Sequence, residues 1–329
     1  MRPPGLPAAL TIAWMPAIDG FAGRLLRPLA AAVALLTACV VARPACAIEV
    51  AACLELERQF ELANRDISSL QMNEILFRAS SKGCAPLARR LLDAGASVNA
   101  RDRDGTIPLG YAAQSGQAAL VDLLLEQGAP INARNLAGST ALYAAAEHDR
   151  TAVVRRLLAK GADPNLPGRS GVSALAAAAF KGNKAIVDLL LENGSKPNEA
   201  DATGKAPIIY AAALGFTAIV QRLLDAGVDV NTRYGNDLTV LMWAAGYADG
   251  AGVLDAENVV KLLLDRNADI NATDDRGRTA LMVAAELDHV AIVELLVARG
   301  ADRSITDKQG KTALDLATSE RVRHALQTQ

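Results

Sequence analysis

The chain has 329 residues, of which 51% are hydrophobic, 21% are charged and only 4% are aromatic, and its formal net charge is −2. The hydrophobic fraction is too high for a disordered chain. Because Lys and Arg do not outnumber Asp and Glu, the composition argues against a nucleic-acid-binding protein, which needs clustered Lys and Arg to neutralise phosphates. A composition with few aromatic residues, rich in Ala and Leu, indicates small helices packed closely together.

Residues 1–47 have the pattern of a secretory signal peptide. Arg24 and Arg27 precede an apolar stretch over residues 29–42, and the segment ends on Ala45-Cys46-Ala47. We therefore expect cleavage after Ala47 and a periplasmic or secreted protein. The stretch is shorter than the roughly 20 residues of a membrane span, which argues against a membrane anchor.

A lipoprotein anchored at Cys39 is an alternative form of the exported chain. Leu36-Thr37-Ala38-Cys39 resembles a bacterial lipobox, although the residues after Cys39 stay apolar where a polar tether is expected. After cleavage at Ala47, the cysteines that remain are Cys53 and Cys84. In an oxidising compartment they are candidates for a disulfide, and two buried thiols are the other possibility.

A period of 33 residues runs through most of the chain, with one longer step of 40. Three independent columns share both the period and the longer step, so one structural unit is repeated. The columns are Asn99, Asn132, Asn165, Asn198, Asn231 and Asn271; Gly95, Gly128, Gly161, Gly194, Gly227, Asn267 and Gly300; and Gly105, Gly138, Gly171, Gly204, Asp237, Gly277 and Gly310.

The unit over residues 102–134 predicts two short helices joined by turns. Asp102-Arg103-Asp104-Gly105 is typical of a turn, and Pro108-Leu109 opens a first helix that Gly116 ends. Leu120 to Leu125 supply a second helix, and Gly128 is a left-handed cap for it. Helices this short cannot bury their leucines alone, so neighbouring units must stack.

These units resemble the ankyrin repeat, because the pattern Gly-x-Thr-Pro-Leu, Ala-Ala, Leu-Leu and Gly-Ala-Asp-x-Asn recurs in them. It stands at 277–281, 284–285, 295–296 and 300–302, and again at 138–142 and 161–165. The resemblance implies an all-α repeat solenoid of helix-turn-helix units with β-hairpin or loop fingers. One departure is systematic: the family's His after the first Leu is replaced by Gly110, Tyr143, Ala176, Ile209, Met242, Met282 and Asp315.

The repeats are expected over residues 73–327, after an N-terminal helix and connector at 48–72. Within the connector region, residues 50–64 predict an extra helix that packs on the first repeat. The units are an N-cap at 73–101, full repeats at 102–134, 135–167, 168–200, 201–233, 234–273 and 274–306, and a C-cap at 307–327.

No pattern of catalytic, metal-binding or cofactor-binding residues is recognisable. Gly310-Lys311-Thr312 has Ile305 where a phosphate-binding loop needs Gly, and the repeat already explains the tripeptide. His148, His289 and His324 stand in separate repeats without a partner nucleophile or carboxylate pair. We therefore expect no enzyme, no metal and no cofactor.

The resemblance implies protein binding through a concave face built from the fingers and the ends of the first helices. Large apolar residues at these ends and Arg or Tyr residues of the fingers are the types enriched in binding hot spots. The candidates are Phe180, Leu214, Tyr247, Leu287, Arg134, Arg169, Arg233 and Tyr234.

Residues 247–257 hold the insertion, predicted as a lengthened turn on the rim of this face. The whole pattern predicts a monomeric scaffold for a protein partner, with no nucleic acid and no membrane span in the mature chain. The alternatives are an inhibitor or immunity-type binder of an exported enzyme, or a lipid-anchored structural protein of the envelope.

Overall fold

The computed structural model describes residues 44–62, 67–246 and 253–327. It divides into two units, Met1–Leu54 and Glu55–Gln329, and the second unit contains the repeats. The predicted signal peptide and Cys39 lie outside the described residues, apart from the backbone from Pro44 onward. None of the described helices is long and apolar enough to cross a membrane.

Helix α2 (Pro44–Leu62) includes residues 50–62 of the extra helix predicted at 50–64, and residues 63 and 64 lie outside the described part. Cys53 and Cys84 are both disulfide-bonded, as the sequence predicted. In the second unit, Gln59 accepts a hydrogen bond from Arg78 at 2.9 Å, and the Arg90 guanidinium lies 5.5 Å from the centre of the Phe60 ring. The last turns of α2 therefore contact the first helix pair through side chains.

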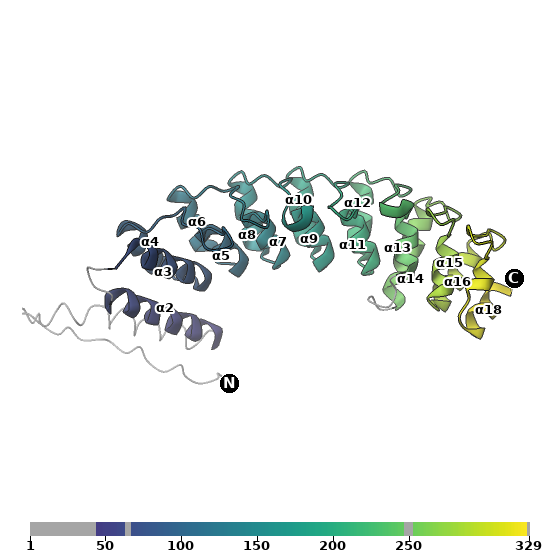
Figure 1. Ribbon diagram of the computed structural model, residues 1–329, viewed down its shortest axis with the longest axis horizontal. Helices are drawn as coiled ribbons and strands as arrows, with labels where there is room; N and C mark the ends of the chain where they lie inside the picture. Colours follow the sequence, from purple (N-terminus) through teal and green to yellow (C-terminus); the bar gives the residue numbers. More distant parts are fainter. Residues whose placement is uncertain (1–43, 63–66, 247–252, 328–329) are drawn as a thin grey trace, which may run out of the picture. The chain divides into compact units, whose positions relative to one another are not determined.

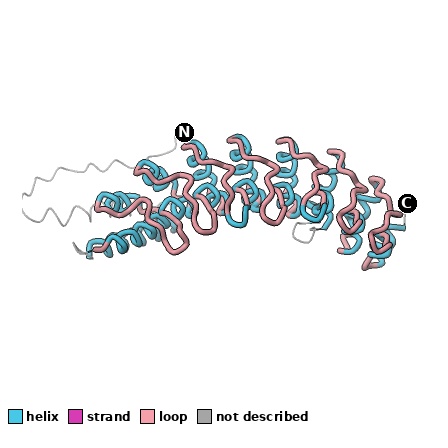
Figure 2. Tube along the Cα trace, turned by 45° about the horizontal axis from the view of Figure 1, so that its top comes forward, coloured by secondary structure: helices cyan, strands magenta, loops and turns pink. Residues whose placement is uncertain are grey.

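The repeats form a series of helix pairs (Figures 1 and 2). Each first helix packs against the first helices of the neighbouring pairs, and each second helix against its own neighbours. The first helices are α3 (Ser69–Lys82), α5 (Pro108–Ser115), α7 (Ala141–Glu147), α9 (Ala174–Lys181), α11 (Pro207–Ala213), α13 (Val240–Gly246), α15 (Ala280–Glu286) and α17 (Ala313–Leu316). The second helices are α4 (Ala85–Asp93), α6 (Ala118–Glu126), α8 (Thr151–Ala159), α10 (Lys184–Glu192), α12 (Thr217–Asp225), α14 (Val253–Asp265), α16 (Val290–Ala298) and α18 (Glu320–Gln327).

Local sequence fixes where each first helix begins. Thr140 and Thr279 cap α7 and α15, each accepting a hydrogen bond from the backbone N–H three residues later. Where no Ser or Thr is present, Pro108 and Pro207 occupy the first helical position, which needs no N–H donor.

The turn between the two helices of a pair needs a left-handed residue. Gly116 has a φ of 83°, and Asp149 takes the same place in the next repeat with a φ of 59°. Asp is among the side chains that tolerate this region best, so the turn survives without Gly.

The connections between pairs are loop fingers (Figure 2, pink), and no sheet is present in the described part of the chain. Each finger is closed by a backbone hydrogen bond over four residues, as from Asp102 N to Thr106 O at 3.2 Å and from Asp274 N to Arg278 O at 3.0 Å. An isolated bridge joins Tyr234 and Leu238. Of the two expected forms, β-hairpin or loop, the fingers take the loop form.

The repeated Asn residues join consecutive units. Asn132 Oδ1 accepts a hydrogen bond from Asp163 N of the next repeat at 3.0 Å, and Asn271 accepts one from Asp302 N at 2.9 Å. Asn165 and Asn231 make the same bond. These bonds link units that lack the family's His, and their regular recurrence explains why Asn repeats in the sequence.

Ion pairs link the second helices in the same direction. An Arg of one repeat binds an Asp of the repeat before it, as Arg222 binds Asp188 at 2.9 Å and Arg299 binds Asp265 at 2.8 Å. Arg156–Asp122 and Arg266–Asp225 complete the series. Because these pairs are at least partly exposed to solvent, they add little to stability, and the apolar core carries most of it.

The predicted insertion is part helix and only part turn. Helix α14 has 13 residues, whereas α12 and α16 have nine, because it begins early at Val253. The prediction of a lengthened turn over all of 247–257 was therefore wrong for the residues from 253 onward. Residues 247–252 lie outside the described part.

We predict that Leu157→Ala lowers the free energy of unfolding by about 2–5 kcal/mol, because Leu157 is completely buried between repeats and the change leaves a cavity. Leu136→Ala is the matched control: Leu136 is 82% exposed at a finger, so its loss should change stability by less than about 0.5 kcal/mol. Urea denaturation measures both. Equal effects of the two changes would contradict the assignment of the core.

Candidate functional site

The fingers and the first helices α5 to α15 form one face of the repeats, which we call the finger groove. Four hollows lie along it, of about 570, 220, 570 and 230 Å³. All four are lined by residues of the fingers, of the first helices and of the turns that follow them, and none of their lining residues comes from a second helix.

The second hollow, of about 220 Å³, is lined by aromatic side chains, and we call it the aromatic hollow. Phe180 at the end of α9 is 51% exposed and meets Tyr210 edge to face, with ring centroids 5.9 Å apart. Ala176 and Ala177 also line the hollow. The remaining lining residues are Tyr143, Glu147, Val172 and Lys181.

Ala177 explains why there is a hollow at this place. Tyr111, Tyr210 and Trp243 occupy the equivalent position of their own repeats, directly before the Ala-Ala pair. Ala177 therefore has a methyl group where three other repeats have a ring. Ala144 in the preceding repeat has the same small side chain, and the hollow lies where Ala177 leaves space beside Phe180 and Tyr210.

Tyrosine hydroxyls in the groove are held by carboxylates. Tyr111 donates to Asp102 at 2.5 Å, Tyr210 donates to Asp201, and Tyr143 donates to Glu147 at 3.3 Å. The bond to Asp102 raises the pKa of Tyr111 to about 12, and burial raises the pKa of Tyr143 to about 12. Burial also raises the pKa of Tyr210. All three phenols are therefore neutral donors near neutral pH.

Asp201 is the acceptor that holds Tyr210. Its burial acts to raise its pKa, but hydrogen bonds from Tyr210 and from the Thr203 side chain outweigh this and leave the pKa below its usual range. Asp201 is thus ionised at neutral pH, and its two oxygens are occupied by the finger and by the tyrosine.

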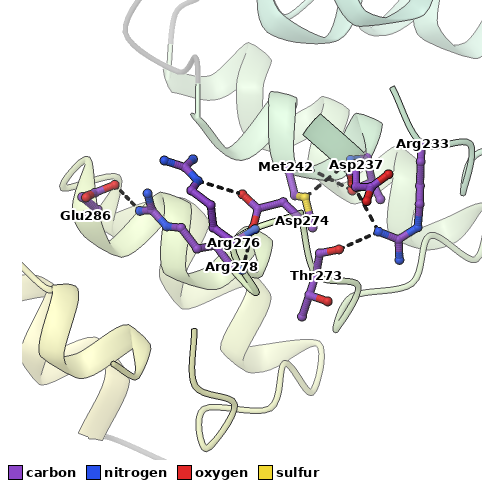
Figure 3. A network of polar contacts seen from close by, with 9 residues as sticks. Arg233, Asp237, Met242, Thr273, Asp274, Arg276, Arg278 and Glu286 are labelled. Carbon is purple, nitrogen blue, oxygen red and sulfur yellow. Dashed lines mark hydrogen bonds and ion pairs between the residues drawn. The ribbon is translucent and has the colours of Figure 1, made fainter. Parts of the chain in front are cut away.

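The fourth hollow lies beside a network of charged residues (Figure 3). The Asp274 carboxylate accepts the backbone N–H groups of Arg276 and Arg278, which closes the finger, and it pairs with the Arg276 side chain at 3.5 Å. The Arg278 guanidinium pairs with Glu286 of α15. Leu287, 43% exposed, forms part of the wall.

Trp243 also lines the fourth hollow, but its ring already has a cation from the chain itself. The Lys205 ammonium lies 5.3 Å from the centre of the Trp243 ring. This distance is within the range of a cation–π interaction.

The predicted binding residues differ in exposure and in the contacts they make. Phe180, Leu287 and Arg169 lie in the groove and are exposed, and Leu214 is half-buried at the end of α11. Tyr234 is only 8% exposed, so its side chain is not presented to a partner. Tyr247 lies outside the described residues.

Arg134 and Arg233 have a structural role, because they join neighbouring fingers. Arg134 donates to Gly138 O of its own finger at 3.0 Å and to Pro167 O before the next finger at 3.1 Å. Arg233 donates to Asp237 O and, across to the next repeat, to Thr273 O at 2.5 Å. Arg101 makes the same pair of bonds, so this column is structural.

Sequence reasoning missed the aromatic residues inside the first helices. Tyr111, Tyr210 and Trp243 share one column at multiples of the 33-residue period, which was a readable signal. Tyr143 stands one place earlier in its repeat, in the column where the family has His, so its ring reaches the aromatic hollow from a different position.

The histidines have structural contacts. His289 Nδ1 lies 2.7 Å from Ala245 O of the preceding repeat, and His148 Nδ1 lies 3.0 Å from Ala144 O. The described residues contain no group of three His, Cys, Asp or Glu residues arranged for a metal ion.

Comparison with known families agrees with this architecture. Residues 76–168, 175–274 and 250–327 match the family model described as ankyrin repeats (3 copies). The chain belongs to the ankyrin repeat family. No relative of this chain is found among curated proteins. Proteins built from ankyrin repeats are generally non-enzymatic modules for protein–protein interaction.

We predict that Arg134→Ala lowers the free energy of unfolding by about 1–2 kcal/mol, because it leaves two finger carbonyls without their donor. Arg169→Ala is the control, since the Arg169 side chain is exposed and makes no hydrogen bond within the described residues; we expect less than about 0.5 kcal/mol. Urea denaturation of the two variants measures the difference. A larger loss for Arg169→Ala would contradict the structural role of Arg134.

Proposed function

We propose that this ankyrin repeat protein is an exported, non-enzymatic scaffold that binds a partner protein through its finger groove. The observation that carries the proposal is the placement of Phe180 and Leu287. Both are large, apolar and exposed, they stand at the ends of first helices in two different repeats, and each lines a hollow.

The groove has the composition of a binding surface. Hot spots in protein interfaces are enriched in aromatic and Arg side chains and sit in pockets that exclude water. Phe180, Tyr210 and Trp243 supply such rings, and Arg169 and Arg276 supply exposed cations nearby. The bonds of Arg134 and Arg233 fix the fingers before a partner arrives, which lowers the ordering cost of binding.

The proposal is tested by placing the photo-crosslinker p-benzoylphenylalanine at single positions of the protein in its native cells. At Phe180 and at Leu287 we expect crosslinking to the same partner protein. At Arg155, exposed on the second helix α8, we expect none, because this position is on the other side of the repeat. The adducts are identified by mass spectrometry.

Substitution measures the energetic contribution of the groove. With the crosslinked partner purified, Phe180→Ala and Leu287→Ala should each weaken binding about fivefold or more, and Arg155→Ala should leave it unchanged. A partner that crosslinks to residue 155 and not to 180 or 287 would reject the finger groove as the binding surface.

Export is the second part of the proposal. The basic, apolar and small-residue pattern of residues 24–47 supports it, and so do the disulfide-bonded Cys53 and Cys84, because such bonds persist in oxidising compartments.

Mass spectrometry of the protein from its native cells should find a mature N-terminus at Ile48 and, under non-reducing conditions, peptides joined by Cys53 and Cys84. If the N-terminus is instead a lipid-modified Cys39, the protein is the lipid-anchored form and not the form cleaved after Ala47. An intact N-terminus together with alkylated Cys53 and Cys84 would reject export.

A further inference from the structure

We infer that the aromatic hollow binds a cationic side chain, arginine or lysine, of the partner protein. This inference rests on the proposed function, since it names the chemistry that one hollow of the finger groove recognises. The hollow has a volume of about 220 Å³, enough for a single long side chain.

The walls of the hollow are aromatic rings set at right angles. Phe180 and Tyr210 meet with an interplanar angle of 89°, and Tyr143 lines the same space. Cations are attracted to the negative face of an aromatic ring, and recognition sites for ammonium groups are often formed by several rings facing one space.

Hydrogen bonding strengthens this property of the two tyrosines. Tyr210 donates its hydroxyl proton to Asp201, and Tyr143 donates to Glu147. A phenol that donates to a carboxylate has more electron density in its ring than a free phenol, so its face attracts a cation more strongly. The Glu147 carboxylate also lines the hollow and can pair with the charge directly.

Charged groups of both signs surround the hollow, and their positions determine where a cation is favoured. Glu147 and Lys181 line the hollow, Asp201 holds the Tyr210 hydroxyl, and Arg169 lies close enough to Tyr143 to affect its pKa. Lys181 and Arg169 disfavour a cation at the rim. A cation inside the hollow faces the aromatic rings and the Glu147 carboxylate, which attract it.

The rest of the chain shows that its aromatic faces take cations. Arg90 covers Phe60, and Lys205 covers Trp243, both within 6 Å of the ring centre. Among the described residues, no cation of the chain itself lies over Phe180, Tyr210 or Tyr143 in the same way. Phe180 is 51% exposed and Tyr210 is half-buried, so these two rings can be reached by a cation from outside, whereas Tyr143 is only 5% exposed and lines the hollow from a buried position.

The test uses three short acetylated and amidated peptides, Gly-Gly-X-Gly-Gly, in which X is arginine, citrulline or norleucine. Citrulline has the shape of arginine without its charge, and norleucine is apolar. Ring NMR signals of the intact protein are followed during titration. We expect the arginine peptide to shift the Phe180 signals and to bind about 3- to 30-fold more tightly than citrulline or norleucine.

Three variants locate the binding. Phe180→Leu keeps an apolar side chain but removes one ring, and Glu147→Gln removes the charge; both should weaken binding of the arginine peptide severalfold. Ala177→Tyr places in the hollow the residue that stands in this column at Tyr111 and Tyr210, so it should block binding. Leu287→Ala, in the fourth hollow, should have no effect.

Two results would overturn the inference. One is equal binding of the norleucine and arginine peptides, which would make the hollow a general apolar pocket. The other is no shift of the Phe180 signals by the arginine peptide at millimolar concentration. Neither result depends on the crosslinking of a partner at Phe180 and Leu287, so the groove function would stand if the inference alone failed.

Discussion

The structure depends on one constraint: its helices are too short to bury their apolar residues within one repeat. Most of the second helices have only nine residues, and leucines such as Leu124, Leu157 and Leu190 become completely buried only because the neighbouring repeats cover them. The hydrophobic contribution to stability is therefore located at the interfaces between repeats. Every repeat needs a neighbour, and a substitution such as Leu157→Ala affects an interface rather than a single unit.

Polar side chains give these interfaces a fixed register. The Asn column joins the ends of consecutive repeats, the Arg column joins consecutive fingers, and the Asp–Arg pairs join the second helices. Together they supply contacts between repeats in a chain that lacks the His of the family pattern. They also separate structure from binding: Arg134 and Arg233 have the residue type of a hot spot, but their donors already bind carbonyl groups.

The surface changes its shape where the repeat pattern is broken. Ala144 and Ala177 interrupt a column of rings, and the aromatic hollow is the space beside Ala177, Tyr210 and Phe180. The longer step of 40 residues has a similar effect on the second helix of its repeat, where α14 begins a turn earlier than its neighbours. Regular positions thus build the scaffold, and irregular positions give its surface a chemical identity.

The sequence by itself determined the fold class and, in the unit over residues 102–134, that Pro108 opens the first helix and that Gly116 and Gly128 follow the ends of the two helices. This was possible because each repeat contains the same local signals, such as the cap at Thr140 and the turn at Gly116, and because a period of 33 residues cannot arise without a repeated unit. Candidate residues such as Phe180 and Leu287 were also found from their column alone.

Only the tertiary structure decided which candidates are exposed. Tyr234 and Phe180 are both aromatic and both stand in variable columns, yet one is buried in its finger and the other is half exposed. The difference lies in side-chain contacts between residues far apart in sequence, as when Arg134 reaches Pro167 or Phe180 meets Tyr210. A column identifies a position within one repeat, whereas exposure depends on the neighbouring repeats that pack around it.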